Sequence, residues 1–439
     1  MSAALDRNLG LLAQVSYGAG QVAGQIFRDV PSLLLLFYMT SVLGIDPALA
    51  GAAIFLPKLV GGVVFDLAVG LLSDRVAGRF ERRHWLLIGM ISAPAAMIAL
   101  FNVPPGDPSS KAAYIATLFS IYMAVFATFS VPYLAIAGDL ILSPEKRTVL
   151  MAGRLVASAV GILVAGAIAP TYVAANGGGE AGYAAMALLL GGICAFCLGI
   201  AWFGSGLAAQ KVGTKIQAQE PLTWAGTRTA LADQRFSVLA GVTLLQLSAG
   251  GMSYAAMLYF MTYNMALPDA LAKIGFVVLL ACVGIIIAQP MWVKLSSRKG
   301  KIWVYVAAAL IHALAHIGFG LSTYGGVMML FVFAVLLGIG NSGWSMIGAS
   351  LLTDIAGEGK SGLYSAVWIA LDKIGFALGG ALIIGFILSG FGFDSGAAKA
   401  GLPQSDQAMF GILMAFSIVP AACNIIAAFV FGRWGKAAI

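Results

Sequence analysis

The sequence predicts an all-α polytopic membrane protein with twelve transmembrane helices in two pseudo-symmetric six-helix bundles. Composition is the first observation, because 60% of the 439 residues are hydrophobic and only 10% are charged, whereas soluble domains carry about a quarter charged residues. The mean hydropathy of +0.95 agrees. The second observation is a series of long apolar runs, and the third is an internal echo between the two halves of the chain.

Each predicted helix is an apolar run long enough to cross roughly 30 Å of hydrocarbon, which needs about twenty residues. Several runs are longer and contain Gly or Pro, which indicates tilted or kinked helices in close contact. In chain order the expected spans are 14–42, 46–72, 84–104, 111–142, 148–175, 181–207, 236–263, 268–293, 302–322, 325–353, 361–390 and 405–432.

The distribution of basic residues sets the expected orientation. With both termini cytoplasmic, eighteen of the 25 Lys and Arg residues fall on the inside and three, Lys111, Lys273 and Lys399, on the outside. This asymmetry follows the positive-inside rule. We therefore expect a protein integral to a plasma or inner membrane, with both termini in the cytoplasm.

The chain divides near its middle into two related halves. We expect an N-terminal bundle over 1–207, a cytoplasmic linker loop over 208–234 and a C-terminal bundle over 235–439. The turn from Gly70 to Arg79 is echoed by Pro290 to Lys299. Asp139 with the following Glu145-Lys146-Arg147 is likewise echoed by Asp354 with Glu358-Gly359-Lys360. Two related halves around a midplane site are typical of secondary transporters.

Other function classes find no support in the residue patterns. The net charge is +7, but the basic residues that produce it lie in short loops and are not interleaved with aromatic residues that could stack on bases. We therefore expect no nucleic-acid partner. His312 and His316 are one helical turn apart but lack a third ligand, so we expect no metal. We find no paired acid and base and no activated nucleophile at membrane depth. An intramembrane enzyme is therefore not favoured, and a non-transporting receptor or scaffold stays an alternative.

Charged residues inside the apolar runs are the first functional candidates. Arg28, Lys58, Arg154 and Lys373 lie within predicted membrane segments, and Asp66 lies within the second. A charge at bilayer depth costs at least about 2.5 kcal/mol, so each should face a cavity or a partner. Two simpler interpretations stay open: Asp66 is neutralised by one of the nearby basic residues, and Arg154 snorkels towards the cytoplasm.

The turn after the second segment resembles that of the major facilitator superfamily. It carries Gly70, Asp74, Arg75, Gly78 and Arg79 in the family's order. The resemblance implies that salt bridges here hold the cytoplasmic side shut in one state. The alternative is an Arg-rich turn that only sets topology. The residues expected at this gate are Asp74, Arg75, Arg79, Asp139, Arg147 and Asp354.

A finer resemblance is to the glycoside-pentoside-hexuronide:cation symporter branch, which includes melibiose carriers and is similar to sodium-dependent lysophospholipid carriers. It extends over most of the chain. The motifs that carry it are Ser16-Tyr17-Gly18, Asp66 with Gly70, Pro132-Tyr133 with Asp139-Leu140, Arg147 with Arg154, Asp354 and Lys373.

The resemblance implies a coupling-ion site in the second helix. The branch has two Asp residues one turn apart here; Asp66 matches the second, and Gly62 stands at the first. Sodium prefers several hard oxygen ligands, whereas one carboxylate suffices for a proton. We therefore favour proton over sodium coupling at Asp66, with no other cofactor.

The substrate site implied by the resemblance lacks the two acidic side chains that sugar carriers of the branch have. Sugar carriers of this branch use acidic residues in helices one and four, and Gln25 and Ser130 stand there in this chain. Because Arg28, Arg154 and Lys373 make the site basic, an anionic substrate such as a uronate, a sulfonated sugar or a lysolipid headgroup fits. Alternatively, the neighbours Arg28 and Asp29 in helix one, and Asp372 and Lys373 in helix eleven, neutralise each other across the bundle. Tyr133 and Trp344 either stack on the substrate or pack in the core.

The sequence thus predicts a secondary active transporter that moves a sugar, glycoside or anionic sugar derivative with a cation by alternating access. A lysophospholipid or other amphiphile symporter or flippase of the same fold is the alternative. We expect a monomer whose partners are the bilayer and a small-molecule substrate.

Overall fold

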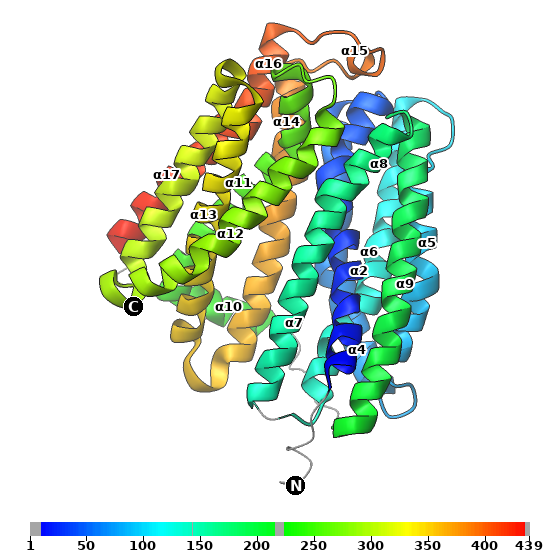
Figure 1. The fold of residues 1–439 in the computed structure, drawn as a ribbon, viewed down its shortest axis with the longest axis vertical. Helices are drawn as coiled ribbons and strands as arrows, with labels where there is room; N and C mark the ends of the chain where they lie inside the picture. Colours follow the sequence, from blue (N-terminus) through cyan, green and yellow to red (C-terminus); the bar gives the residue numbers. More distant parts are fainter. Residues whose placement is uncertain (1–9, 143, 216–223, 435–439) are drawn as a thin grey trace. The chain divides into compact units, whose positions relative to one another are not determined.

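The computed structural model describes residues 10–142, 144–215 and 224–434, and every element in these ranges is a helix except for one isolated bridge. The chain forms two compact units (Figure 1). Unit 1 takes residues 1–31 and 60–221, and unit 2 takes 32–59 and 222–439.

Unit 1 contains the first part of α2 and the helices up to the middle of the chain. Helix α5 packs against both α6 and α9, and all three are seen as long adjoining helices in Figure 1. The elements are α2 (Leu11–Phe37), η2 (Gly61–Phe65), α4 (Asp66–Val76), α5 (His84–Phe101), α6 (Pro108–Asp139), α7 (Pro144–Leu163), η3 (Val164–Ile168), α8 (Ala169–Ala175) and α9 (Glu180–Val212).

Unit 2 contains the end of α2, the following hairpin and the C-terminal helices. Its elements are η1 (Tyr38–Val42), α3 (Pro47–Val60), α10 (Trp224–Ala232), α11 (Gln234–Tyr259), η4 (Phe260–Asn264), α12 (Ala270–Lys299), α13 (Lys301–Ala377), η5 (Leu378–Ile383), α14 (Ile384–Gly390), α15 (Ser395–Lys399), α16 (Asp406–Leu413), η6 (Met414–Ile418) and α17 (Val419–Trp434).

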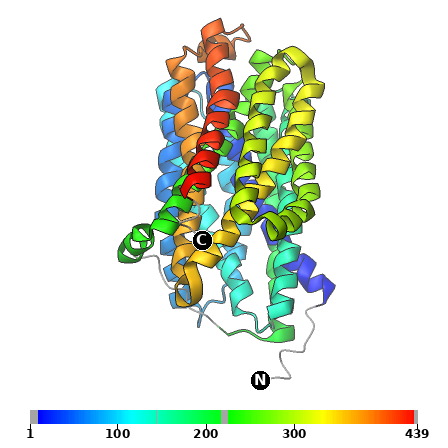
Figure 2. The same cartoon turned by 90° about the vertical axis from the view of Figure 1, so that its left-hand side faces the viewer.

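The 77-residue element α13 is not one straight rod. A straight helix of that length would reach about 115 Å. Instead, Gly340 lies against the backbone of His312, and Gly348 lies against the ring of Trp368. Gly326 has a φ of +74°, a left-handed conformation that favours glycine. Figure 2 shows the yellow part of α13 folding back on itself as antiparallel rods.

The helices agree with a membrane environment. Within the described ranges, ten helices are long and apolar enough to cross a bilayer, and α3 is a shorter apolar helix. The predicted second span, 46–72, is divided into α3, η2 and α4. The predicted linker loop 208–234 is helical over α10, because Ala230 is buried in the core of unit 2. This chain is therefore an integral membrane protein, and ten apolar helices in its described part are of spanning length.

The boundary between the units crosses two helices, which the sequence did not indicate. The boundary divides α2 directly after Pro31. It divides the chain again at Val60, the last residue of α3 and directly before the π-helical turn Gly61–Phe65. Proline removes a backbone donor and a π turn widens the helix, so both are points where a helix can bend. Beyond the boundary, the Thr40 hydroxyl lies 2.6 Å from the Tyr259 hydroxyl within unit 2.

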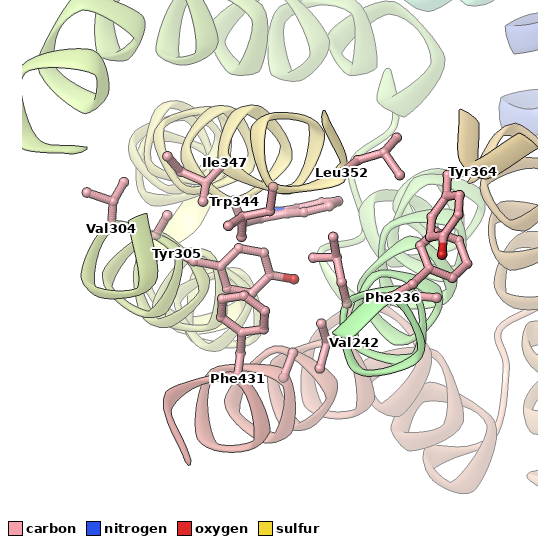
Figure 3. Packing of buried hydrophobic residues seen from close by; sticks show 14 of the residues in the cluster. Phe236, Val242, Val304, Tyr305, Trp344, Ile347, Leu352, Tyr364 and Phe431 are labelled. Atoms are coloured by element: carbon pink, nitrogen blue, oxygen red, sulfur yellow. The ribbon is translucent and has the colours of Figure 1, made fainter. Parts of the chain in front are cut away.

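The core of unit 2 contains a chain of polar side chains among aromatic ones. Figure 3 shows Tyr305 beside Phe431 and Trp344 above them. The Tyr305 hydroxyl donates to Gln246, whose Nε2 donates to Asn424 Oδ1 at 3.1 Å. That oxygen lies 3.2 Å from His312 Nδ1. Because buried polar groups need partners, this chain ties α11, α13 and α17 together.

We predict that Asn424→Leu destabilises the protein by about 1–3 kcal/mol for each buried group that it leaves without a partner. The apparent melting temperature of the purified protein measures this loss. The control is Asn102→Leu, because Asn102 is exposed and donates only to the carbonyl of the preceding turn. Equal melting temperatures for the two variants would show that the buried chain carries no stability.

Candidate functional site

A continuous chain of polar side chains joins α2 to α7 within unit 1. Arg154 Nη2 donates to Gln21 Oε1 at 2.7 Å, and Gln21 Nε2 donates to Ser158 Oγ at 3.0 Å. The Ser158 hydroxyl then donates to Gln25 Oε1 at 3.4 Å. Gln21 and Gln25 are four residues apart, so they share one helix face, as do Arg154 and Ser158. Two helix faces therefore meet along a polar line.

The chain ends at the Arg28–Asp29 pair. Gln25 Nε2 donates to Asp29 Oδ2 at 2.6 Å, and Arg28 Nε lies 3.0 Å from Asp29 Oδ1. The side chain of Asp29 is 9% exposed and that of Arg28 is 58% exposed. The charge of this buried carboxylate is thus balanced by its sequence neighbour. This ion pair is local to α2, between two consecutive residues.

Tyr17 and Tyr133 form a reciprocal clasp between α2 and α6 beside the polar chain. Each hydroxyl donates to the backbone carbonyl of the other residue at 2.9 Å, and the rings stack with centroids 4.7 Å apart. The Arg154 guanidinium carbon lies 5.4 Å from the Tyr133 ring centroid, a cation–π arrangement. Tyr133 is buried and serves as the platform for Arg154.

The remaining predicted substrate residues are not members of this polar chain. Ser130 is half-buried in α6 and takes no part in the polar chain. Trp344 belongs to the core of unit 2, where its indole donates to His312 Nδ1 at 3.1 Å. Lys373 is half-buried in the last segment of α13, also in unit 2. Unit 1 therefore brings together Gln25, Arg28, Asp29, Tyr133 and Arg154.

Asp66 is the first residue of α4 and directly follows the π-helical turn Gly61–Phe65. Its side chain is half-buried. Turns of this kind interrupt the regular backbone pattern and are frequent at functional sites. In unit 2, Lys58 Nζ donates to Ser32 Oγ at 3.0 Å, which links the two chain segments where they cross the unit boundary.

An arginine that sequence reasoning did not single out connects two predicted gate residues. Arg82 Nη1 lies 2.6 Å from both carboxylate oxygens of Asp139, and Arg82 Nη2 lies 2.6 Å from Asp74 Oδ1. The Arg82 side chain is 3% exposed. Arg75 and Arg79 are exposed, and the side chain of Arg147 lies outside the described part of the chain. Arg82 is therefore the partner of both Asp74 and Asp139.

Unit 2 repeats the second half of this arrangement. Lys301, at the start of α13, forms an ion pair with Asp354. Arg82 likewise lies two residues before the start of α5, and Asp139 ends α6. In each unit a basic residue at or just before the start of a helix thus binds an Asp further along the chain, which is the last residue of α6 in unit 1 and lies beyond Gly326 of α13 in unit 2. The echo between the two halves of the sequence was the signal that could have identified Arg82.

A family model and the named relatives agree on a transporter. The family model described as MFS/sugar transport protein matches residues 16–434. The chain is 24% identical to the inner membrane symporter YicJ of Escherichia coli, over 97% of this chain and 92% of the relative. It is 25% identical to a protein of Salmonella typhimurium provisionally named a sulfoquinovose importer, over 98% and 91%.

Among solved structures, the fold is similar to a bacterial homolog of the human lysosomal transporter Spinster, in an inward-facing and occupied conformation. The TM-score is 0.73, with 14% sequence identity and 96% of each chain covered. At this identity the likeness concerns the fold alone.

We predict that Arg82→Met destabilises the protein by about 3–5 kcal/mol, because it leaves a buried carboxylate without its partner. Thermal unfolding of the purified protein measures the loss. Arg82→Lys should lose less, since a lysine keeps the charge but lacks the two terminal nitrogens with which Arg82 contacts Asp139 and Asp74 separately.

The control for this prediction is Arg75→Met, which removes the same charge from an exposed position in the same turn and should change stability by less than about 0.5 kcal/mol. If Arg82→Met were no less stable than Arg75→Met, the bridge would have no role in holding unit 1 together.

Proposed function

Because this chain belongs to the MFS/sugar transport protein family, we propose that it is a cation-coupled symporter of a sugar, a glycoside or an anionic sugar derivative. The protein is a membrane transporter and not an enzyme. We propose further that it works as a monomer with both termini in the cytoplasm.

The observation that carries this proposal is the polar chain from Arg154 to Arg28. Sugars present several hydroxyl groups, each of which donates and accepts hydrogen bonds. Gln21, Gln25 and Ser158 offer both donors and acceptors within one line, and amide side chains suit hydroxyls in both roles. The face of the Tyr133 ring packs against the Arg154 guanidinium. The set is suited to a polyhydroxy solute that also carries an acid group.

Twelve membrane crossings in two six-helix bundles complete the proposed architecture. Support comes from α13, whose reversals at Gly326 and between Gly348 and Trp368 divide it into three antiparallel segments. Support also comes from the matching ion pairs Arg82–Asp139 and Lys301–Asp354. Two such halves would alternate access by rocking around a central site, and these ion pairs, with Asp74, would help to close the cytoplasmic side.

Asp66 is the proposed carrier of the coupling ion. Of the two positions in the second helix that carry Asp in the branch this chain resembles, only the second is an Asp here, because Gly62 stands at the first. A single half-buried carboxylate can bind and release a proton, whereas sodium prefers a cage of several oxygens. Its place directly after a π-helical turn would let protonation act on the helix at a point where the helix can bend.

We predict that Asp66→Asn abolishes concentrative uptake while exchange of substrate across the membrane persists, because the amide cannot carry a proton. Uptake into proteoliposomes under a proton gradient, and separately under a sodium gradient, measures coupling. The control is Asp406→Asn, at the exposed first residue of α16.

Concentrative uptake by Asp66→Asn at the rate of the control would show that Asp66 does not bind the coupling ion. Uptake by the unmodified protein that follows sodium and ignores the proton gradient would exclude proton coupling. Transport of lysophospholipid in place of any sugar would favour the alternative substrate class.

A further inference from the structure

Arg154 has few of its hydrogen-bonding groups satisfied. A guanidinium has five N–H donors. One of them meets Gln21 Oε1, while Nη1 lies 3.4 Å from the sulfur of Met151, a weak acceptor. Its Nε is buried and has no hydrogen-bond partner among the described residues. The guanidinium is therefore held in place without being saturated.

The charge of Arg154 is also uncompensated within the described part of the chain. No carboxylate there lies within ion-pair distance of it, whereas Arg28 is paired with Asp29 at 3.0 Å. The nearest groups, Gln21 and Tyr133, are neutral. The polar chain thus holds two guanidinium groups and one carboxylate.

A half-buried cation in a membrane helix is costly unless an anion or oriented dipoles face it. Arginine binds carboxylate and sulfonate oxygens through two parallel N–H groups, and such bonds are among the stronger ones in proteins. Gln21 uses both ends of its amide, accepting from Arg154 and donating to Ser158. This fixes the guanidinium against the face of Tyr133 while adding no charge of its own.

We propose that Arg154 binds the single acid group of an anionic sugar derivative, and that the neutrality of Gln21 determines this specificity. The inference rests on the proposed function and narrows it to substrates with one carboxylate or sulfonate. A glutamate at position 21 would supply the missing anion from the protein itself, and the site would then favour a neutral sugar.

The test compares Gln21→Glu with the unmodified protein for binding of glucuronate, 6-sulfonated glucose and glucose, by ligand-induced thermal stabilisation and calorimetry. We expect the preference for the acidic sugars over glucose to fall at least tenfold. Because the new carboxylate would pair with Arg154, we also expect Gln21→Glu to raise the melting temperature of the ligand-free protein. A misfolded variant would show a lower one.

The matched control is Gln14→Glu. It adds the same charge to the same helix face, seven residues or about 10 Å towards the N-terminus, and Gln14 takes no part in the polar chain. Arg154→Gln is the second variant, and it should lose preference for the acidic sugars without introducing a negative charge. The two acidic probes distinguish a carboxylate from a sulfonate as the preferred group.

An unchanged preference in both Gln21→Glu and Arg154→Gln would overturn the inference, as would a preference of the unmodified protein for glucose. In both cases the proposed function stands, because a sugar still binds. If the unmodified protein binds none of the three sugars, the proposed function fails together with the inference.

Discussion

Charge placed away from water must be compensated, and the degree of compensation distinguishes the charged residues of this protein. Arg82 is buried between two carboxylates, so its role is to hold helices together. Arg28 is paired with Asp29 and remains partly exposed. Arg154 faces neutral partners and an aromatic ring. Full compensation suits a structural contact, whereas incomplete compensation suits a residue that waits for an anionic ligand.

The same constraint is met differently in the two units. In unit 1, Nη1 of Arg82 contacts both oxygens of Asp139 at the end of α6, and this ion pair is almost completely buried. In unit 2 the matching pair of Lys301 and Asp354 is exposed at 33% and 48%. Exposed pairs contribute about 0–1 kcal/mol, whereas breaking a buried pair costs several times more. The two ion pairs therefore occupy matching positions in the two units but contribute different amounts to stability.

Much of the fold and part of the site could be predicted from the sequence, because charges inside apolar runs are conspicuous. This marked Arg28, Asp29 and Arg154, and the family resemblance added Gln25 and Tyr133. Gln21 and Ser158 were not predicted, because a neutral polar residue in an apolar run is not conspicuous as a charge is. Their contacts also join positions up to 137 residues apart. Arg82 was not predicted because four arginines lie close together in this part of the sequence. Composition alone does not indicate which of them is buried. The crossing of the unit boundary at Pro31 and Val60 depends on packing that no local pattern encodes.

The central claim is that this chain transports an acidic sugar derivative through a site that includes Arg154. Counterflow in proteoliposomes tests it most directly, because counterflow needs a working carrier and no imposed ion gradient. Vesicles loaded with unlabelled glucuronate or sulfonated glucose and diluted into a trace of the labelled compound should transiently accumulate label above the outside concentration. Label that never exceeds that level, for either acidic sugar, in vesicles containing correctly folded protein, would contradict the account.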